Sequence, residues 1–150
     1  MTCTYAFASP TYDCAVDLRH RVLRVPLERD IADDPLAEEY DEIHVGAFAA
    51  AALVGTASLR DDGAGGLKMR QVAVEPAYSG RGVGRALVAA CEAIARRRGA
   101  VRLYCHARDS AGGFYEACGW AVEGDGFTEV RLPHHRMSAP DARLRPPGEG

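Results

Sequence analysis

The spacing of hydrophobic and polar residues predicts strands and helices that alternate along the chain. A segment opening at Pro10 and residues 83–98 show helical spacing; in the second, Val83, Leu87 and Ile94 share one apolar face. A further helix is predicted over residues 110–118. The predicted strands are residues 3–8, 43–48, 52–60, 67–74, 101–105, 120–123 and 127–132. Strands come first and then alternate with helices, which predicts an α/β fold with a mixed sheet.

Glycine-rich segments divide these elements. Residues 61–66 read Asp-Asp-Gly-Ala-Gly-Gly and predict a turn between two strands. Residues 124–126, Gly-Asp-Gly, predict the turn of a hairpin between the last two strands. Gly99 and Gly119 follow the second and third helices, as C-terminal capping glycines do.

Length, charge and composition narrow the functional classes. The chain has 150 residues, which favours one domain, predicted over residues 1–137. Residues 138–150 are rich in proline, glycine and charge and predict a disordered tail. The net charge of −3 gives no footprint for nucleic acid. No apolar run approaches the roughly 20 residues of a membrane span, and no secretory leader is evident, so we expect a cytoplasmic protein without a membrane partner.

The cysteines do not indicate metal or nucleophile chemistry. There are five, none in a C-x-x-C pair, so metal-ligand spacing is absent and reduced thiols are expected. Cys105 is followed directly by His106, a pair that could suggest a thiol nucleophile and its base. Because adjacent strand residues point to opposite faces, these two side chains are badly placed to act together.

The loop before the second helix has the composition of a phosphate-binding loop. A P-loop ends in Gly-Lys-Ser/Thr, but here Gly84 is followed by Arg85 and Ala86; a dinucleotide fingerprint would need glycine at position 85. A plain strand–helix turn is one interpretation. The other is a loop whose amides bind pyrophosphate at a helix start, where the dipole favours anions. The candidate binding residues are Ser79, Gly80, Arg81, Gly82, Val83, Gly84 and Arg85.

This loop and a second motif resemble the GNAT superfamily of N-acetyltransferases. The family loop runs Gln/Arg-x-x-Gly-x-Gly/Ala; Gly82 and Gly84 match it, and Ser79 replaces the usual first residue. The second motif is Asn-x-x-Ala, then aromatic-Tyr and Gly-aromatic, in which Arg108 replaces the asparagine. Its matching residues are Ala111, Phe114, Tyr115 and Gly119. Two further stretches, Leu18-Arg19 with Val22 and residues 127–137, resemble the ElaA-like branch, so the resemblance covers residues 15–137.

The resemblance implies a GNAT fold, with a mixed sheet of about seven strands flanked by about four helices. Acetyl-CoA would lie where two parallel strands, residues 67–74 and 101–105, splay apart. The resemblance places its pantetheine arm on the backbone of Val72, Ala73 and Val74, with Phe114 nearby. Tyr115 would protonate the departing thiolate, since a hydroxyl within reach can supply that proton; the alternative is a tyrosine that only packs. No metal is expected.

The base is left open. Many family members carry a glutamate in the strand before the loop, but the matching residue here is Lys68. His134 is the best candidate by resemblance, because imidazole titrates in the right range; a merely hydrogen-bonded histidine is as good a reading. The other candidates are Glu129, His44, Glu28 and ordered water. The acidic stretch 28–42 could attract a cationic amine, although such charge runs are more often solvated loops.

The sequence therefore predicts direct acetyl transfer from acetyl-CoA to a primary amine of a small molecule or peptide. One alternative is a catalytically silent acyl-CoA-binding module, favoured by the missing strand carboxylate and disfavoured by Tyr115. A dinucleotide-binding domain is a weaker alternative. The acceptor, the acyl chain and the oligomeric state, including a homodimer, stay open.

Overall fold

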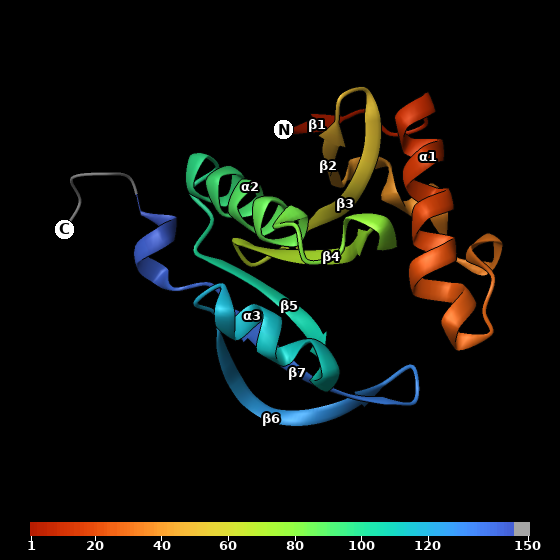
Figure 1. Ribbon diagram of the computed structural model, residues 1–150. Coiled ribbons are helices and arrows are strands. Elements are labelled where there is room, and N and C mark those ends of the chain that lie inside the picture. Colours follow the sequence, from red (N-terminus) through yellow and green to blue (C-terminus); the bar gives the residue numbers. More distant parts are fainter. Residues whose placement is uncertain (146–150) are drawn as a thin grey trace. The chain divides into compact units, whose positions relative to one another are not determined.

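The computed structural model describes residues 1–145 and places seven strands in one sheet (Figure 1). The strands are β1 Thr2–Tyr5, β2 Ile43–Ala49, β3 Ala52–Asp61, β4 Gly66–Val74, β5 Arg102–Arg108, β6 Ala121–Glu129 and β7 Leu132–Ser138. The α-helices are α1 Pro10–Arg19, α2 Val83–Arg97 and α3 Gly112–Ala117. These elements confirm the mixed sheet predicted from the hydrophobic pattern.

The strand order places β4 and β5 side by side as a parallel pair. The order is β1-β2-β3-β4-β5-β7-β6, with β4 and β5 parallel and with β1–β2, β2–β3, β5–β7 and β6–β7 antiparallel. The β4–β5 register begins at Gly66 with Arg102 and ends at Lys68 with Tyr104. Both strands continue past that point, β4 to Val74 and β5 to Arg108. The predicted parallel pairing of β4 and β5 is confirmed, and it covers only the first part of each strand.

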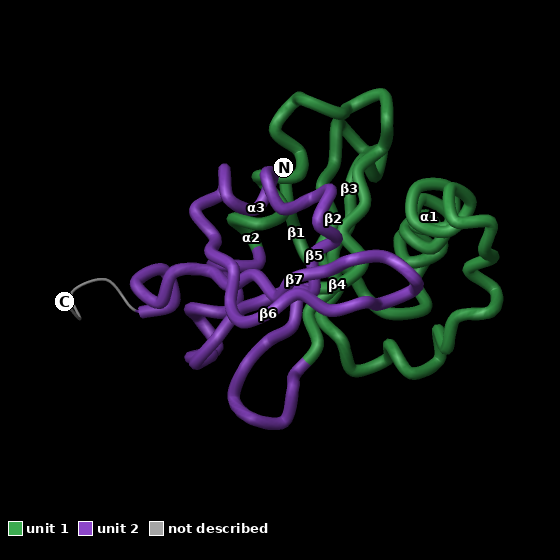
Figure 2. Tube along the Cα trace, turned by 90° about the horizontal axis from the view of Figure 1, so that it is seen from below, with its two compact units in different colours: residues 1–60, 70–90 green, residues 61–69, 91–150 purple. Residues whose placement is uncertain are grey.

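The chain forms two compact units that interleave in sequence (Figure 2). Unit 1 comprises residues 1–60 and 70–90, and unit 2 comprises residues 61–69 and 91–150. Strand β4 and helix α2 each run from one unit into the other. In unit 1, Gly55 of β3 lets α2 approach closely, because a Cβ there would lie 2.8 Å from Val83 and 3.0 Å from Leu87. The core of unit 1 includes Leu18, Val45, Leu59, Leu87 and Val88.

Unit 2 is built around the paired strands β5 and β7 and the short helix α3. Its core includes Leu67, Met69, Leu103, Tyr115, Trp120 and Met137. The Trp120 indole donates a 3.2 Å hydrogen bond to Glu92, which also accepts one from Arg143 at 2.9 Å. These bonds connect α2, the start of β6 and the C-terminal residues within this unit.

The hairpin turn at the end of the sheet is not where the sequence predicts it. Strand β6 continues through residues 124–126. The turn lies at Val130 and Arg131, which both have positive φ (45° and 63°). The Gly-Asp-Gly segment instead forms an irregularity in the β6–β7 register between Glu123 and Phe127. A Cβ at Gly126 would lie 2.9 Å from the His135 ring, so glycine permits a close approach of the two strands there.

The first part of the predicted disordered tail, from residue 138 to residue 144, is folded. Ser138 belongs to β7, residues 141–144 form a 3₁₀ turn, and Ala139 and Leu144 are buried. The part of the predicted tail at residues 146–150 lies outside the described residues.

Candidate active site

The glycine loop begins helix α2 in unit 1. A 3₁₀ turn, Pro76–Tyr78, is followed by Ser79 and by two glycines with positive φ, Gly80 at 75° and Gly82 at 83°. Such φ values favour glycine. Residues 79–82 are exposed, and the first bond of the α2 ladder runs from the Ala86 amide to the Gly82 carbonyl at 3.0 Å. The amides of residues 83–85 therefore precede the first helical donor, which is where a helix can bind an anion.

Strand β4 leads into this loop with a local distortion. Gln71 has φ of 57°, a left-handed conformation in the middle of the strand. Its side-chain oxygen accepts a 3.0 Å hydrogen bond from Arg24, whose guanidinium also pairs with Asp34 at 2.6 Å. Beyond the kink, Val72 and Val74 are half-buried and Ala73 is buried. No sequence pattern predicts this kink, because it occurs at an ordinary glutamine.

Arg24 comes from a π-helical turn, His20–Arg24, that continues α1. A π-turn widens the helix locally and is often found at functional sites. Arg21 of the same turn makes bonds of 2.8 and 3.0 Å to Glu75, the residue between β4 and the glycine loop. Two arginines of one turn therefore hold the kink of β4 and its end, all within unit 1.

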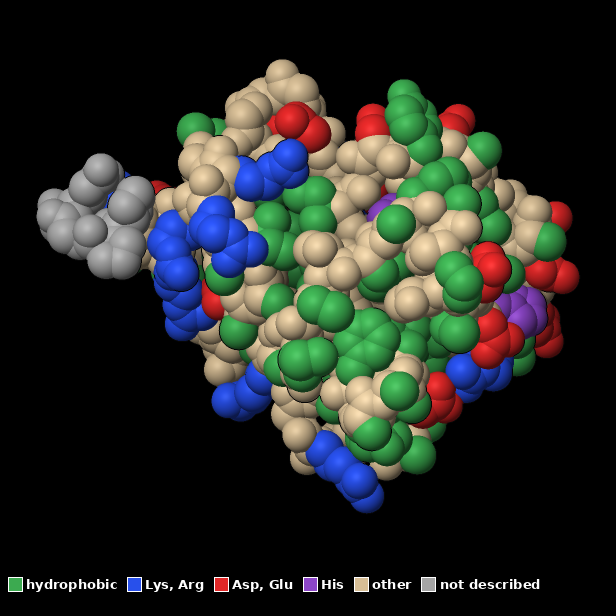
Figure 3. Space-filling model, turned by 90° about the horizontal axis from the view of Figure 1, so that it is seen from above, with side chains coloured by type: hydrophobic (Ala, Val, Ile, Leu, Met, Phe, Trp, Pro, Cys, Tyr) green, Lys and Arg blue, Asp and Glu red, His purple; other side chains and the backbone are tan. Residues whose placement is uncertain are grey.

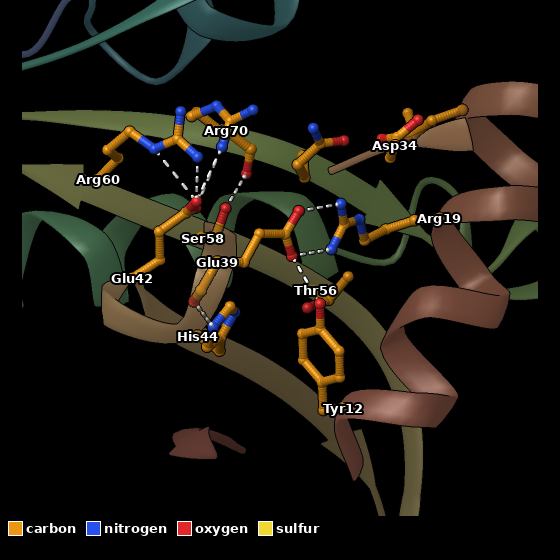
Figure 4. Close-up of polar contacts among 12 residues, drawn as sticks. Tyr12, Arg19, Asp34, Glu39, Glu42, His44, Thr56, Ser58, Arg60 and Arg70 are labelled. Atoms are coloured by element: carbon orange, nitrogen blue, oxygen red, sulfur yellow. Dashed lines mark hydrogen bonds and ion pairs between the residues drawn. The ribbon is translucent and has the colours of Figure 1, made fainter. Parts of the chain in front are cut away.

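A buried polar cluster fills the side of unit 1 between α1 and the acidic segment (Figure 4). Arg19 and Glu39 form two parallel 2.8 Å hydrogen bonds, with side chains only 3% and 4% exposed. The Tyr12 hydroxyl donates to Glu39 at 2.9 Å, and the His44 ring bonds the Glu39 carbonyl at 3.0 Å. Burial alone would raise the pKa of Glu39, but the hydrogen bonds and charge of Arg19 outweigh burial and lower it.

Several acidic residues of segment 28–42 have arginine partners. Besides Glu39 and Asp34, the Glu42 carboxylate is 0% exposed and accepts hydrogen bonds from Arg60 at 2.6 Å and Arg70 at 3.0 Å (Figure 4). Their charge is neutralised inside unit 1, so they would attract a cationic acceptor less than the sequence alone suggests. His44 is buried in the same cluster, whereas Glu28 is exposed with φ of 56°.

Tyr115 lies on α3 in unit 2, with 7% of its surface exposed. Its ring packs against Phe114 and Trp120, with centroid distances of 5.0 and 5.5 Å. Burial, with the neighbouring thiol of Cys105, raises the pKa of Tyr115 well above 10. The phenol is therefore protonated at neutral pH, as a proton donor must be.

On strands β5, β6 and β7, two imidazoles face one carboxylate. His106 Nδ1 is 3.3 Å from Glu129 Oε1, and His134 Nε2 is 3.8 Å from Glu129 Oε2. Phe127 packs against both rings, at 5.0 Å from His106 and 5.8 Å from His134. The His134 side chain is 4% exposed and its Nδ1 is 2.8 Å from the Leu132 carbonyl oxygen. The structure thus brings together two sequence candidates, His134 and Glu129, and adds His106.

The neighbours of these residues have other partners. His135 Nδ1 pairs with Asp109 at 2.7 Å. Burial raises the pKa of Cys105 to about 12, so it is a neutral thiol at physiological pH rather than a nucleophile. Among residues 1–145, no three His, Cys, Asp or Glu side chains are grouped so that they could hold a metal ion. In that same part of the chain, no helix has the length and apolarity to cross a membrane.

The surface drawn in Figure 3 carries both signs of charge among hydrophobic side chains. The chain has 18 basic and 21 acidic residues.

Comparisons with known proteins agree with this geometry. The sequence profile of the GNAT acetyltransferase family matches residues 12–120. A Bacillus subtilis (strain 168) protein named as a candidate acetyltransferase is 30% identical over 115 residues, which span 71% of this chain and 78% of that protein. A candidate N-acetyltransferase from Lactobacillus plantarum is 26% identical, with a TM-score of 0.75 over 91% of this chain and 96% of that one.

Two more distant structures show the same fold. Escherichia coli ElaA superposes with a TM-score of 0.77 at 19% identity, covering 93% of this chain and 99% of that one. An aminoglycoside 6'-N-acetyltransferase, solved in complex with coenzyme A, gives 0.74 at 18% identity, covering 93% of this chain and 96% of that one. The profile match defines the class of protein, and these likenesses and the parallel β4–β5 pair agree with it in fold. The chain belongs to the GNAT acetyltransferase family.

Proposed function

We propose that this protein is an acetyl-CoA-dependent N-acetyltransferase that moves the acetyl group directly to a primary amine of a small molecule or peptide. The observation that carries the proposal is the parallel β4–β5 pair whose register ends at Lys68 and Tyr104. The register does not continue to the ends of the two strands, so an extended ligand such as pantetheine could pair with the backbone of residues 72–74 of β4. Family membership makes acetyl-CoA the expected donor.

The pyrophosphate of CoA would bind the loop from Ser79 to Arg85. This loop is exposed, opens a 15-residue helix and carries two left-handed glycines. Backbone amides at a helix start and the positive end of the helix dipole both favour a doubly charged anion. The guanidinium of Arg81 lies 5.3 Å from the centre of the Tyr78 ring and adds positive charge to the loop. The pantetheine arm would pair with the backbone of residues 72–74, and Phe114 would contact the cofactor.

Tyr115 would give its proton to the CoA thiolate as the C–S bond breaks. The phenol is protonated at physiological pH and can give up that proton once negative charge develops on sulfur. The acceptor's proton would go to the imidazole and carboxylate group of β5–β7, in which His134 is the candidate named by the family resemblance. The acceptor reacts as a free amine, and no covalent enzyme intermediate is involved.

The experiment that tests the function is release of free thiol from acetyl-CoA with a panel of primary amines. The panel should include amino acids, polyamines, aminoglycosides and short peptides with free N-termini. Amine-dependent thiol release, with the acetylated amine identified by mass spectrometry, supports the proposal. Calorimetric binding of acetyl-CoA without turnover of any amine would instead favour a silent acyl-CoA-binding module.

A further inference from the structure

We infer that His106, held by Glu129, is the general base that takes the proton from the acceptor amine. This inference rests on the proposed acetyl transfer and names a catalytic group for it that the motif resemblance does not supply. It also fills the role that a strand carboxylate has in many relatives, a role for which this chain offers only Lys68 at the matching position.

The position of His106 in the sheet is the first argument. Tyr104 is the last residue of β5 that pairs with β4, and His106 is two residues further along β5. Residues two apart on a strand project to the same face, so His106 follows Tyr104 on the part of β5 beyond its register with β4. The residue between them, Cys105, is the neighbour of the proposed acid, Tyr115, within unit 2. His106 is closer in sequence to the end of that register than any other histidine.

The chemistry of the pair is the second argument. His106 Nδ1 lies 3.3 Å from Glu129 Oε1, so in the neutral ring the Nδ1–H donates to the carboxylate. The proton then sits on Nδ1, and Nε2 has a free lone pair. A carboxylate that fixes the tautomer and stabilises the imidazolium is the arrangement found behind catalytic histidines. The His106 side chain is 26% exposed, so an acceptor can reach it.

The charges around His106 keep it unprotonated. Burial lowers its pKa below the usual 6.5, and the charges of Lys68 on β4 and Arg136 on β7 lower it further. Glu129 on β6 acts in the opposite sense and raises it. The aromatic rings of Tyr104 and Phe127 also lie next to the His106 ring, with centroid distances of 6.3 and 5.0 Å. The net result is a neutral imidazole at physiological pH, as a proton acceptor requires.

His134 has a different place in this group. Its side chain is only 4% exposed, and its Nδ1 is taken up by the Leu132 carbonyl. Its Nε2 faces the other oxygen of Glu129 at 3.8 Å. His134 is buried away from an acceptor amine and its ring stacks on Phe127, so we assign it a packing role rather than that of the base.

The proposed step balances as follows. The amine lone pair attacks the thioester carbonyl carbon, a C–N bond forms and the carbonyl oxygen becomes an oxyanion. The proton leaves nitrogen for Nε2 of His106, the oxyanion reforms C=O, and the C–S bond breaks. The thiolate takes the proton of Tyr115. The products are an acetamide and free CoA thiol, and the imidazolium and phenolate exchange protons with solvent to restore the enzyme.

The test compares His106→Asn with His135→Asn in the full chain. His135 is the matched control, because its Nδ1 also pairs with a carboxylate, that of Asp109. It lies on β7 opposite Ala107 of β5, and Ala107 projects to the face of the sheet opposite to that of His106. His106→Asn should lower kcat by at least about 10²-fold while leaving the acetyl-CoA Kd unchanged, and His135→Asn should do neither. Free imidazole should restore part of the lost kcat in His106→Ala and should not do so in His134→Ala.

The Glu129→Gln variant distinguishes a catalytic role of His106 from a purely structural one. Since the carboxylate raises the pKa of His106, its removal should move the acid-side fall of kcat/KM to lower pH, a change that a packing role would not produce. His106→Asn with wild-type kcat and an unchanged pH profile would overturn the inference and leave acetyl transfer intact. A wild-type protein that binds acetyl-CoA but turns over no amine would overturn the proposed function, and the base with it.

Discussion

Arg24 donates a 3.0 Å hydrogen bond to the side chain of Gln71 at the point where β4 adopts φ of 57°. Arg24 belongs to a π-helical turn, and its other partner is Asp34. A left-handed non-glycine residue costs of order 1–3 kcal/mol and persists only when its surroundings hold it. The kink is therefore held by Arg24, 47 positions away in the sequence, which is itself paired with Asp34.

This relationship predicts how substitutions at Gln71 should rank. Gln71→Asn and Gln71→Gly both suit the left-handed region, so each should change the free energy of unfolding by less than about 1 kcal/mol. Gln71→Val places a β-branched residue there and should destabilise the protein by about 1–3 kcal/mol. Urea unfolding measures all three. Equal stabilities for valine and asparagine would mean that the kink is absent in solution.

The buried pair of Arg19 and Glu39 predicts a strong dependence of stability on one carboxylate. Glu39→Gln leaves Arg19 buried without its counter-charge, and it should lower the free energy of unfolding by about 3–5 kcal/mol. Urea unfolding at neutral pH is the measurement. Asp17→Asn is a useful comparison, since its exposed pair with Arg21 should contribute under about 1 kcal/mol.

The same pair predicts a direction with pH. Because the folded pKa of Glu39 is lowered, its stabilisation is present above the unfolded value near 4.5 and is lost as pH falls through the folded value. Wild-type stability should therefore decline below about pH 5 more steeply than that of Glu39→Gln. Parallel pH profiles for the two proteins would show that Glu39 is not the linked group.

The glycine loop can be tested with a matched pair of glycines. Gly82 in the loop and Gly99 after α2 have similar φ values, 83° and 67°, and a Cβ at either would meet no atom within 4 Å. Valine at either position should thus cost similar backbone strain. Only Gly82→Val should weaken CoA binding by calorimetry, because it alone obstructs approach to the helix amides. Equal losses at both sites would remove the loop from the proposed function.

Local patterns were enough to predict the strands, α2 and the glycine loop, because hydrophobic period and glycine position are local properties. They failed at residues 124–126, where a Gly-Asp-Gly that suits a turn is instead paired through an irregular strand, and the turn lies at Val130 and Arg131. The choice between the two depends on pairing with β7, which no local pattern encodes.

In the candidate site, too, local motifs predict some residues, and only the folded chain brings the others together. Tyr115 and the loop were found through motifs, and His134 with Glu129 through resemblance. The sequence argues only against a Cys105–His106 pair and indicates no other partner for His106. Its actual partner, Glu129, is 23 residues away and comes from another strand. Likewise, the acidic stretch looked solvated, yet Glu39 and Glu42 are buried against arginines that the sequence did not connect to them.

The last prediction concerns the chemical role of Tyr115. Its hydroxyl is the proposed donor to the CoA thiolate, and burial keeps it protonated across the physiological range. Phenylalanine keeps the ring that packs on Phe114 and Trp120 and removes only the proton. Tyr115→Phe should therefore lower kcat by about 10²-fold, the low end for a lost general acid. The acetyl-CoA Kd should change little, because the hydroxyl acts once charge develops on sulfur.

The measurement needs an assay in which chemistry limits the rate, such as single-turnover thiol release. Tyr104→Phe is the matched control, since that hydroxyl bonds Asp62 at 3.1 Å and is not assigned to the reaction. If Tyr115→Phe keeps the wild-type rate in single turnovers, the tyrosine is a packing residue. The thiolate would then leave unprotonated or take its proton from water, and the His106 base would have to act without an acid partner on α3.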